Sequence, residues 1–190
     1  VTGVQTCALP IYLYSELLHE AVKKLQGSLI SDNDIDPEVT LPISNFIPEK
    51  YCPDLHERMN LYQRLATSAT EQNIEDIFDE IEDMYGELPN EVLALKISSL
   101  LKLQLKSLHA LSLKAEYLSD KKSYLVNITL IGNFIKNPQK FIDEMKNNTN
   151  FKITPQNKVI QNIGITSNNQ HESILYACQK AINNIKTLLD

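Results

Sequence analysis

The chain has 190 residues, a size that suits one domain, and 43% of them are hydrophobic and 22% charged. Its formal net charge of −6 argues against a duplex-binding module, which needs clustered Lys and Arg to neutralise phosphates. Because no apolar run approaches the roughly 20 residues that cross a bilayer and no signal-peptide pattern is present, we expect a cytoplasmic protein that contacts neither membrane nor nucleic acid directly.

The first eleven residues have no periodicity that continues into the chain, and we expect 1–11 to be a foreign or artefactual leader. Apolar residues then recur at helical spacing from Tyr12 to Leu25, and Gly27 follows as a stop. The pattern predicts a first helix within residues 12–30.

A polar loop follows, and then Val39, Leu41 and Ile43 alternate with polar or proline positions. This alternation predicts a short extended segment. Pro42 cannot donate a backbone hydrogen bond, so it confines this segment to the edge of a sheet or to a short extended stretch.

Two amphipathic helices are predicted next, with Asp54 and Thr70 as their N-caps. Gly86 ends the second helix, and Pro89 begins a third that is apolar nearly all round and therefore central. The apolar stripe expected for the first of these helices is Leu55, Met59, Tyr62, Leu65, Ala66 and Ala69. The stripe expected for the second is Ile74, Ile77, Phe78, Ile81, Met84 and Tyr85.

After Leu108 the apolar period changes from about 3.6 to about 2, which predicts strands instead of helices. Two alternating runs on either side of residues 119–122 predict a hairpin with Leu111, Leu113, Ala115 and Tyr117 on one strand and Tyr124, Val126, Ile128 and Leu130 on the other. A short helix interrupted near Pro138 should turn Phe141, Ile142 and Met145 inward.

Two further short strands and a final helix complete the predicted fold. The strands carry Phe151 with Ile153 and Val159 with Ile163, and the helix runs from about Gln170 to Leu189. The predicted class is α+β: a helical half, followed by a small, mostly antiparallel sheet with a C-terminal amphipathic helix.

The acidic residues are concentrated between Arg64 and Lys96, a segment that contains no other Lys or Arg. On the predicted helix, Asp76, Glu80 and Asp83 share the face opposite the apolar stripe. A solvated surface is one interpretation of this face, and electrostatic docking onto an Arg-rich partner is the other.

The sequence offers little for catalysis or metal binding. The phosphate-loop, dinucleotide, zinc-protease and nucleophile-elbow motifs are absent, and the four histidines fall in different predicted elements. Cys7, Cys52 and Cys178 lack disulfide or metal spacing, and we expect Cys178 to be a buried free thiol on an apolar stripe. No catalytic, cofactor or metal residue is therefore assigned.

Residues 12–108 nevertheless resemble the C-terminal part of bacterial transcription-repair coupling factors. The resemblance lies in a connector and helix with the pattern Ile47-Pro48-x-x-Tyr51-x-Pro53-Asp54-x-x-x-x-Met59-x-Leu61-Tyr62-x-Arg64-Leu65-Ala66. It continues in Glu80-Ile81-x-Asp83-Met84-Tyr85-Gly86-x-Leu88-Pro89, where family members usually carry Arg or Lys at the position of Met84.

The resemblance implies that the chain is part of a larger ATP-dependent DNA translocase that displaces stalled RNA polymerase and recruits excision repair through UvrA. Residues 12–30 would link to the missing motor, and residues 31–190 would be a non-enzymatic regulatory domain. That domain would hold no cofactor, whereas the parent would use ATP and magnesium. It would dock through Asp76, Glu80 and Asp83 on the N-terminal UvrB-like module and mask UvrA binding.

Two other function classes remain open at this stage. The chain could be a stand-alone acidic adaptor for some other basic protein, or an enzyme whose site has no recognised motif. A walled pocket with several polar groups and perturbed pKa values would favour the enzyme, and a flat acidic face would favour docking.

Overall fold

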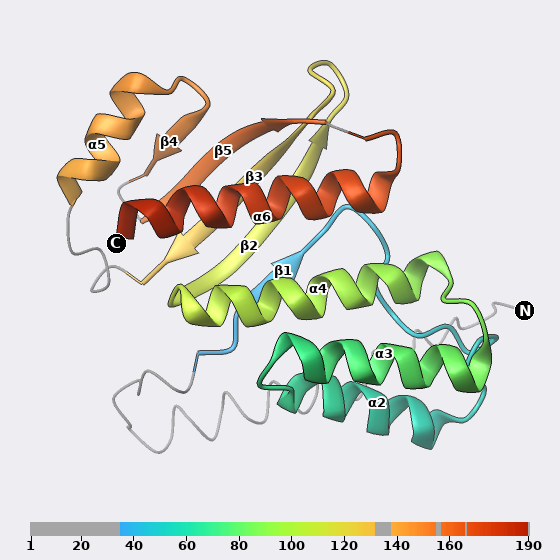
Figure 1. Ribbon diagram of the computed structural model, residues 1–190. Coiled ribbons are helices and arrows are strands. Elements are labelled where there is room, and N and C mark those ends of the chain that lie inside the picture. Colours follow the sequence, from blue (N-terminus) through green and yellow to red (C-terminus); the bar gives the residue numbers. More distant parts are fainter. Residues whose placement is uncertain (1–34, 132–137, 155–156, 166, 190) are drawn as a thin grey trace, which may run out of the picture. The chain divides into compact units, whose positions relative to one another are not determined.

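A five-stranded sheet in the order β1-β2-β3-β5-β4 organises the part of the chain that the computed structural model describes (Figure 1). The described residues are 35–131, 138–154, 157–165 and 167–189. The expected leader at 1–11, the helix predicted within 12–30 and Cys7 lie outside these ranges.

The strands are short except for the central hairpin. Their bounds are β1 Glu38–Thr40, β2 Ala110–Leu118, β3 Ser123–Leu130, β4 Phe151–Ile153 and β5 Lys158–Gly164. Only β1 pairs in parallel, with β2, and the other pairings are antiparallel. The mostly antiparallel sheet with a C-terminal helix confirms the α+β prediction, and β1, which ends before Pro42, lies at the edge of the sheet.

The predicted hairpin is β2 and β3, with one irregularity that the alternation did not predict. Ala110 pairs with Leu130 but Ser112 pairs with Thr129, so Leu111 is an extra residue in β2. This bulge turns Ala110 into the core and leaves Leu111 47% exposed. Of the four residues in the predicted alternation, Leu113 and Ala115 are buried, whereas Leu111 and Tyr117 at its two ends are each 47% exposed.

One face of the sheet is covered by two helices, α4 (Asn90–Ser107) and α6 (Gln170–Leu189), which lie side by side (Figure 1). The inward side chains of β2, β3 and β5 form a single core with them, and Leu101 and Cys178 in this core have no exposed surface. Burial raises the pKa of the Cys178 thiol to about 12, so the thiol stays protonated at neutral pH. Both the central third helix and the buried Cys178 were predicted.

A buried amide fixes α6 against the sheet. Gln161 on β5 is 3% exposed, and its Nε2 donates to the carbonyl of Ala181 at 3.0 Å. Its Oε1 accepts from Nδ2 of Asn184 at 2.8 Å. Both functional ends of the buried amide are thus satisfied, which makes the position of α6 along β5 specific.

On the opposite side of α4 lie α2 (Leu55–Thr67) and α3 (Glu71–Tyr85) (Figure 1). They form a second, smaller core with the connector before α2, built around Leu61, Phe78 and Ile81. Asp54 caps α2 by accepting from the backbone N–H groups of His56 and Glu57, and Thr70 caps α3 through Asn73. Both predicted N-caps are confirmed.

The apolar stripe predicted for α2 was partly wrong. Leu61 and Leu65 are its buried residues, whereas Leu55 is 54% exposed and Ala66 is also exposed. The helix carries apolar residues on more than one face, so its partner α3 decides which of them is covered.

Two further expectations for helix ends and faces need correction. Met84 at the end of α3 is 50% exposed, while Ile74, Ile77, Phe78 and Ile81 are buried as predicted. Pro89 precedes α4 as its N-cap instead of occupying its first turn. In α5 (Pro138–Asn147), which contacts β4, Ile142 is 43% exposed and not inward, because this short helix covers only a sheet edge.

Candidate interaction surface

The acidic residues of α3 lie on a ridge opposite its buried stripe. Asp76, Asp79 and Asp83 are all exposed, and their spacing of three and four residues keeps them on one side of the helix. Seven residues of helix span about 10 Å, so the three carboxylates form a row of that length. We call these three residues the acidic ridge.

Glu80 differs from its predicted neighbours because it has a basic partner. Nη1 and Nη2 of Arg64 on α2 donate to the two carboxylate oxygens of Glu80 at 3.0 and 2.5 Å. This bidentate pair lowers the pKa of Glu80 and raises that of Arg64. The expectation that no basic group neutralises this face locally was therefore wrong for Glu80, because helix packing brings Arg64 across from α2.

Two glutamates on the flank of α3 that faces α4 also have partners on α4. Lys96 on α4 forms an ion pair with Glu75, and its ammonium group lies 5.8 Å from the centre of the Phe78 ring. Glu71 accepts from Nε2 of Gln104 at 3.1 Å. The acidic ridge and Glu82 remain as the exposed acidic residues of α3 with neither an ion pair nor a side-chain hydrogen bond to another helix in the described structure.

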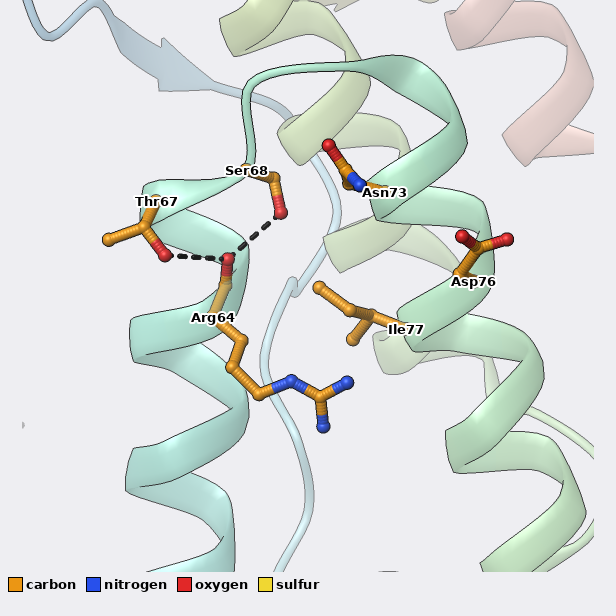
Figure 2. A pocket seen from close by; sticks show the side chains of 6 residues that line it. All are labelled: Arg64, Thr67, Ser68, Asn73, Asp76 and Ile77. Atoms are coloured by element: carbon orange, nitrogen blue, oxygen red, sulfur yellow. Dashed lines mark hydrogen bonds between the residues drawn. The ribbon is translucent and has the colours of Figure 1, made fainter.

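An open groove of about 360 Å³ lies between the end of α2 and the start of α3. Figure 2 shows Arg64 and Ile77 facing each other across it. The Arg64 carbonyl accepts from the hydroxyls of Thr67 and Ser68 at 3.2 and 2.9 Å, which closes the last turn of α2. A groove this open lacks the walls that hold a substrate away from water.

The connector before α2 holds the helical layer together through two tyrosines. The backbone N–H of Ile47 donates to the Tyr62 hydroxyl at 2.7 Å, and the Tyr51 hydroxyl donates to the carbonyl of Gly86 at 2.6 Å. Arg58 donates to the carbonyls of Cys52 and Pro53. Tyr51 and Tyr62, which belong to the family pattern of the sequence, therefore stabilise the fold.

Gly86 is needed at the end of α3 for its backbone conformation. Its φ is 86° and its ψ is −168°, a combination that essentially only glycine adopts. The aromatic ring of Tyr85 packs on that of Tyr51 with 5.7 Å between ring centres, and hydrogen bonding to the Cys52 thiol raises the pKa of Tyr85 to about 12. This tyrosine therefore stays protonated and is unsuited to act as a base near neutral pH.

The described residues contain no group of three or more His, Cys, Asp or Glu side chains that could hold a metal ion. The histidines that fall in the described ranges lie on separate elements, and Nε2 of His171 at the start of α6 lies 3.1 Å from the carbonyl of Asn90 at the start of α4. None of the helices in these ranges could cross a bilayer. What the structure brings together on α3 is a surface suited to electrostatic contact.

Comparison with known proteins gives a consistent result. Residues 41–129 match the family described as the TRCF domain. The transcription-repair-coupling factor of Myxococcus xanthus is 38% identical over 96 residues, which is 50% of this chain and 8% of that protein. That of Escherichia coli (strain K12) is 30% identical over 138 residues, 68% of this chain and 12% of that protein.

The similarity extends into the last third of the chain. The transcription-repair-coupling factor of Staphylococcus haemolyticus (strain JCSC1435) is 26% identical over 179 residues, 93% of this chain and 14% of that protein. A crystal structure of the C-terminal domain of transcription-repair coupling factor has the same fold, with a TM-score of 0.58 at 16% identity, covering 80% of this chain and 95% of that one. The chain thus corresponds to a small share of each relative's length.

Proposed function

We propose that this chain, whose residues 41–129 are a TRCF domain, acts as the C-terminal interaction and regulatory domain of a transcription-repair coupling factor. The parent would be an ATP-dependent DNA translocase of the cytoplasm that displaces stalled RNA polymerase and recruits nucleotide excision repair. ATP and magnesium would bind elsewhere in the parent, and this domain would need no cofactor. The relatives' shared name and the open form of the groove between α2 and α3 support this assignment.

Its mechanism would be docking onto the N-terminal UvrB-like module of the same protein, which would mask the surface that UvrA uses. The observation that carries this proposal is the acidic ridge, which faces outward while Glu75 and Glu80 on its two flanks are already paired. Exposed ion pairs contribute only about 0–1 kcal/mol each, so several together form a contact that a motor can open. Glu80 would help by holding Arg64 in place beside Asp76 and Asp83.

The test reverses charge on the ridge and leaves the Arg64–Glu80 pair intact. In the full-length factor, Asp76→Lys with Asp83→Lys places cations against the basic partner surface, which costs several kcal/mol of docking. UvrA binding without DNA or polymerase should then appear, as measured by titration of UvrA into the variant. Both side chains point away from the Ile77 and Phe78 stripe, so folding should be nearly unchanged.

A matched control separates the ridge from general charge effects. Glu49→Lys with Glu87→Lys changes the net charge by the same amount at exposed positions outside α3. This control should stay closed and should not bind UvrA. If the ridge variant also stays closed, or if the control opens equally, the docking face lies elsewhere.

A further inference from the structure

Burial alternates strictly along residues 35–47, the first segment that the structure describes. Every even-numbered residue in this segment is exposed, and every odd-numbered residue is buried or half-buried. The covered residues are Ile35, Pro37, Val39, Leu41, Ile43, Asn45 and Ile47. Only β1 within the segment is a strand, so sheet pairing alone does not cause the alternation, and the whole segment lies with one side against the domain. We call residues 35–47 the strap.

The strap joins the two cores of the domain. Three of its residues pack against the sheet core, namely Val39, Leu41 and Ile43. At its other end, Ile47 is 3% exposed and belongs to the core of the helical region. Between these two contacts, Nδ2 of Asn45 donates to the Ser98 hydroxyl of α4 at 2.8 Å. The strap therefore passes from the sheet to the helical layer in contact with α4, the helix that lies between them (Figure 1).

The contacts that hold the first part of the strap are individually weak. The Asp36 carboxylate accepts from Nζ of Lys102 at 3.2 Å and lies 3.9 Å from Nζ of Lys106, but 50% of the Asp36 side chain is exposed. Exposed ion pairs stabilise a protein little. β1 is a three-residue edge strand, and Pro42 cannot donate a further backbone hydrogen bond to the sheet. A segment with such contacts detaches at a lower free-energy cost than the cores beneath it.

The end of the strap contacts α2 and, through α2, affects α3. The backbone N–H of Ile47 donates to the Tyr62 hydroxyl at 2.7 Å. Two residues further along α2, Arg64 holds Glu80 on the flank of the acidic ridge. Detachment of Ile47 would uncover the core that α2 and α3 share and would remove the hydrogen-bond donor to Tyr62. The packing of α2 on α3 therefore depends on the strap.

We propose that the strap is a releasable coupling element, which links the chain before Ile35 to the docking surface on α3. While the strap lies on α4, α2 and α3 are held in the form that presents the acidic ridge. When the strap detaches, α2 loosens and docking weakens. Ile35 begins the compact unit Ile35–Asp190, so a displacement of the preceding chain acts on the strap first. The coupling of the strap to α2 is independent of docking, whereas its effect on docking rests on the proposed function of the ridge.

The first test weakens the start of the strap in the 190-residue chain and follows amide hydrogen exchange. Asp36→Lys places like charges beside Lys102 and Lys106, so the amides of β1 should exchange about three- to tenfold faster. The amides of Ile47 and α2 should accelerate by a similar factor, while those of β3 and α6 keep their protection. Faster exchange in β1 alone would overturn the coupling. Equal acceleration in β3 would mean general destabilisation and would overturn it too.

Control variants separate the ion pairs from general charge effects. Asp120→Lys changes the net charge equally at an exposed turn position and should leave exchange in β1 and α2 unchanged. Lys102→Glu with Lys106→Glu should reproduce the effect of Asp36→Lys. Combining all three substitutions should restore protection, because opposite charges then face each other again. If the combination fails to restore protection, or if Asp120→Lys has the same effect as Asp36→Lys, these ion pairs do not hold the strap and the proposal is wrong.

The last test measures docking in the full-length factor by titration with UvrA in the absence of DNA and polymerase. Asp36→Lys should increase the apparent UvrA affinity at least about threefold, in proportion to the detached fraction, and the charge-swapped combination should reverse this increase. If Asp76→Lys with Asp83→Lys opens the factor but Asp36→Lys does not, the strap does not regulate docking. If neither variant opens it while the strap and α2 still accelerate together in hydrogen exchange, the proposed docking function is wrong and the coupling within the domain is supported.

Discussion

The sheet region and the helical region of this domain are held together in different ways. The sheet core, shared by the strands, α4 and α6, contains twenty buried residues among those described, whereas the core of α2, α3 and the connector contains nine. The helical region compensates with side-chain hydrogen bonds from Tyr51, Tyr62 and Arg58 to backbone atoms. A region with few buried apolar contacts unfolds locally at a lower free-energy cost than a region with many. This lower cost suits a surface that must bind its partner and release it.

The largest expected effect comes from the sheet core. Leu101 on α4 has no exposed surface, so Leu101→Ala should lower the free energy of unfolding by about 2–5 kcal/mol through lost burial and a residual cavity. The urea midpoint measures this loss. Leu100, half-buried on the side of the helical core, is the matched control and should lose less. An unchanged midpoint for Leu101→Ala would contradict the division into two cores.

A second substitution weakens only the helical region. Tyr62→Phe leaves the N–H of Ile47 buried without an acceptor, and such a loss costs about 1–3 kcal/mol. Hydrogen exchange should speed up in α2 and in the connector while the amides of β3 stay protected. Tyr51→Phe removes a more exposed bond and should have a smaller effect. Uniform loss of protection across the sheet would show that the two regions unfold together.

The backbone of Gly86 gives a third test, also with a matched control. A side chain at Gly86 meets no atom within 4 Å, so Gly86→Ala should destabilise only through its φ of +86°, by about 1–3 kcal/mol. Gly164 at the end of β5 has equal space and no positive φ, so Gly164→Ala should be nearly neutral. Thermal unfolding of the two variants compares them directly, and equal melting temperatures would remove the conformational argument.

The smallest effect concerns the ion pair between α2 and α3. Arg64 lowers the pKa of Glu80 in the folded chain, so the pair's contribution is complete above the free carboxyl value near 4.5 and is lost as pH falls through the lowered folded pKa. Because both side chains are more than a third exposed, the contribution is about 0–1 kcal/mol. Glu80→Gln should flatten the acid limb of the stability curve slightly, and an identical pH profile would show that solvent screens the pair fully.

The sequence correctly predicted those elements that are determined by residues close together in the chain. Asp54 and Thr70 cap helices through backbone groups two or three residues away, and the period of two in β3 places Tyr124, Val126 and Ile128 together on the core side of one strand. These interactions depend on neighbours along the chain. The hairpin and the final helix were predicted for the same reason.

The errors occur where a distant element decides the outcome. Arg64 and Glu80 are sixteen residues apart and meet only because α2 packs on α3, so the sequence alone made Glu80 look unpaired. Leu111 faces out because of one extra residue in a pairing that alternation does not record. Met84 fits the helical stripe, yet it is 50% exposed because no described element covers it.

Asp76 and Asp83 are exposed, as both a docking face and a solvated surface require, and the charge-reversal experiment distinguishes the two. In the sequence, Arg64 is noted only as part of a family pattern. In the structure it pairs with Glu80, and this pairing distinguishes Glu80 from the carboxylates of the acidic ridge.

The position of α4 has a consequence for the order of assembly during synthesis. Its partner α3 directly precedes it in the chain and β2 directly follows it, so its first contacts on both faces close short loops. By contrast, α6 must return from the end of the chain to complete the sheet core. Because local contacts form fastest and translation is vectorial, the helical layer can assemble on the ribosome before α6 emerges. The core of the helical region would thus form first, and the sheet core would be completed when α6 packs onto it.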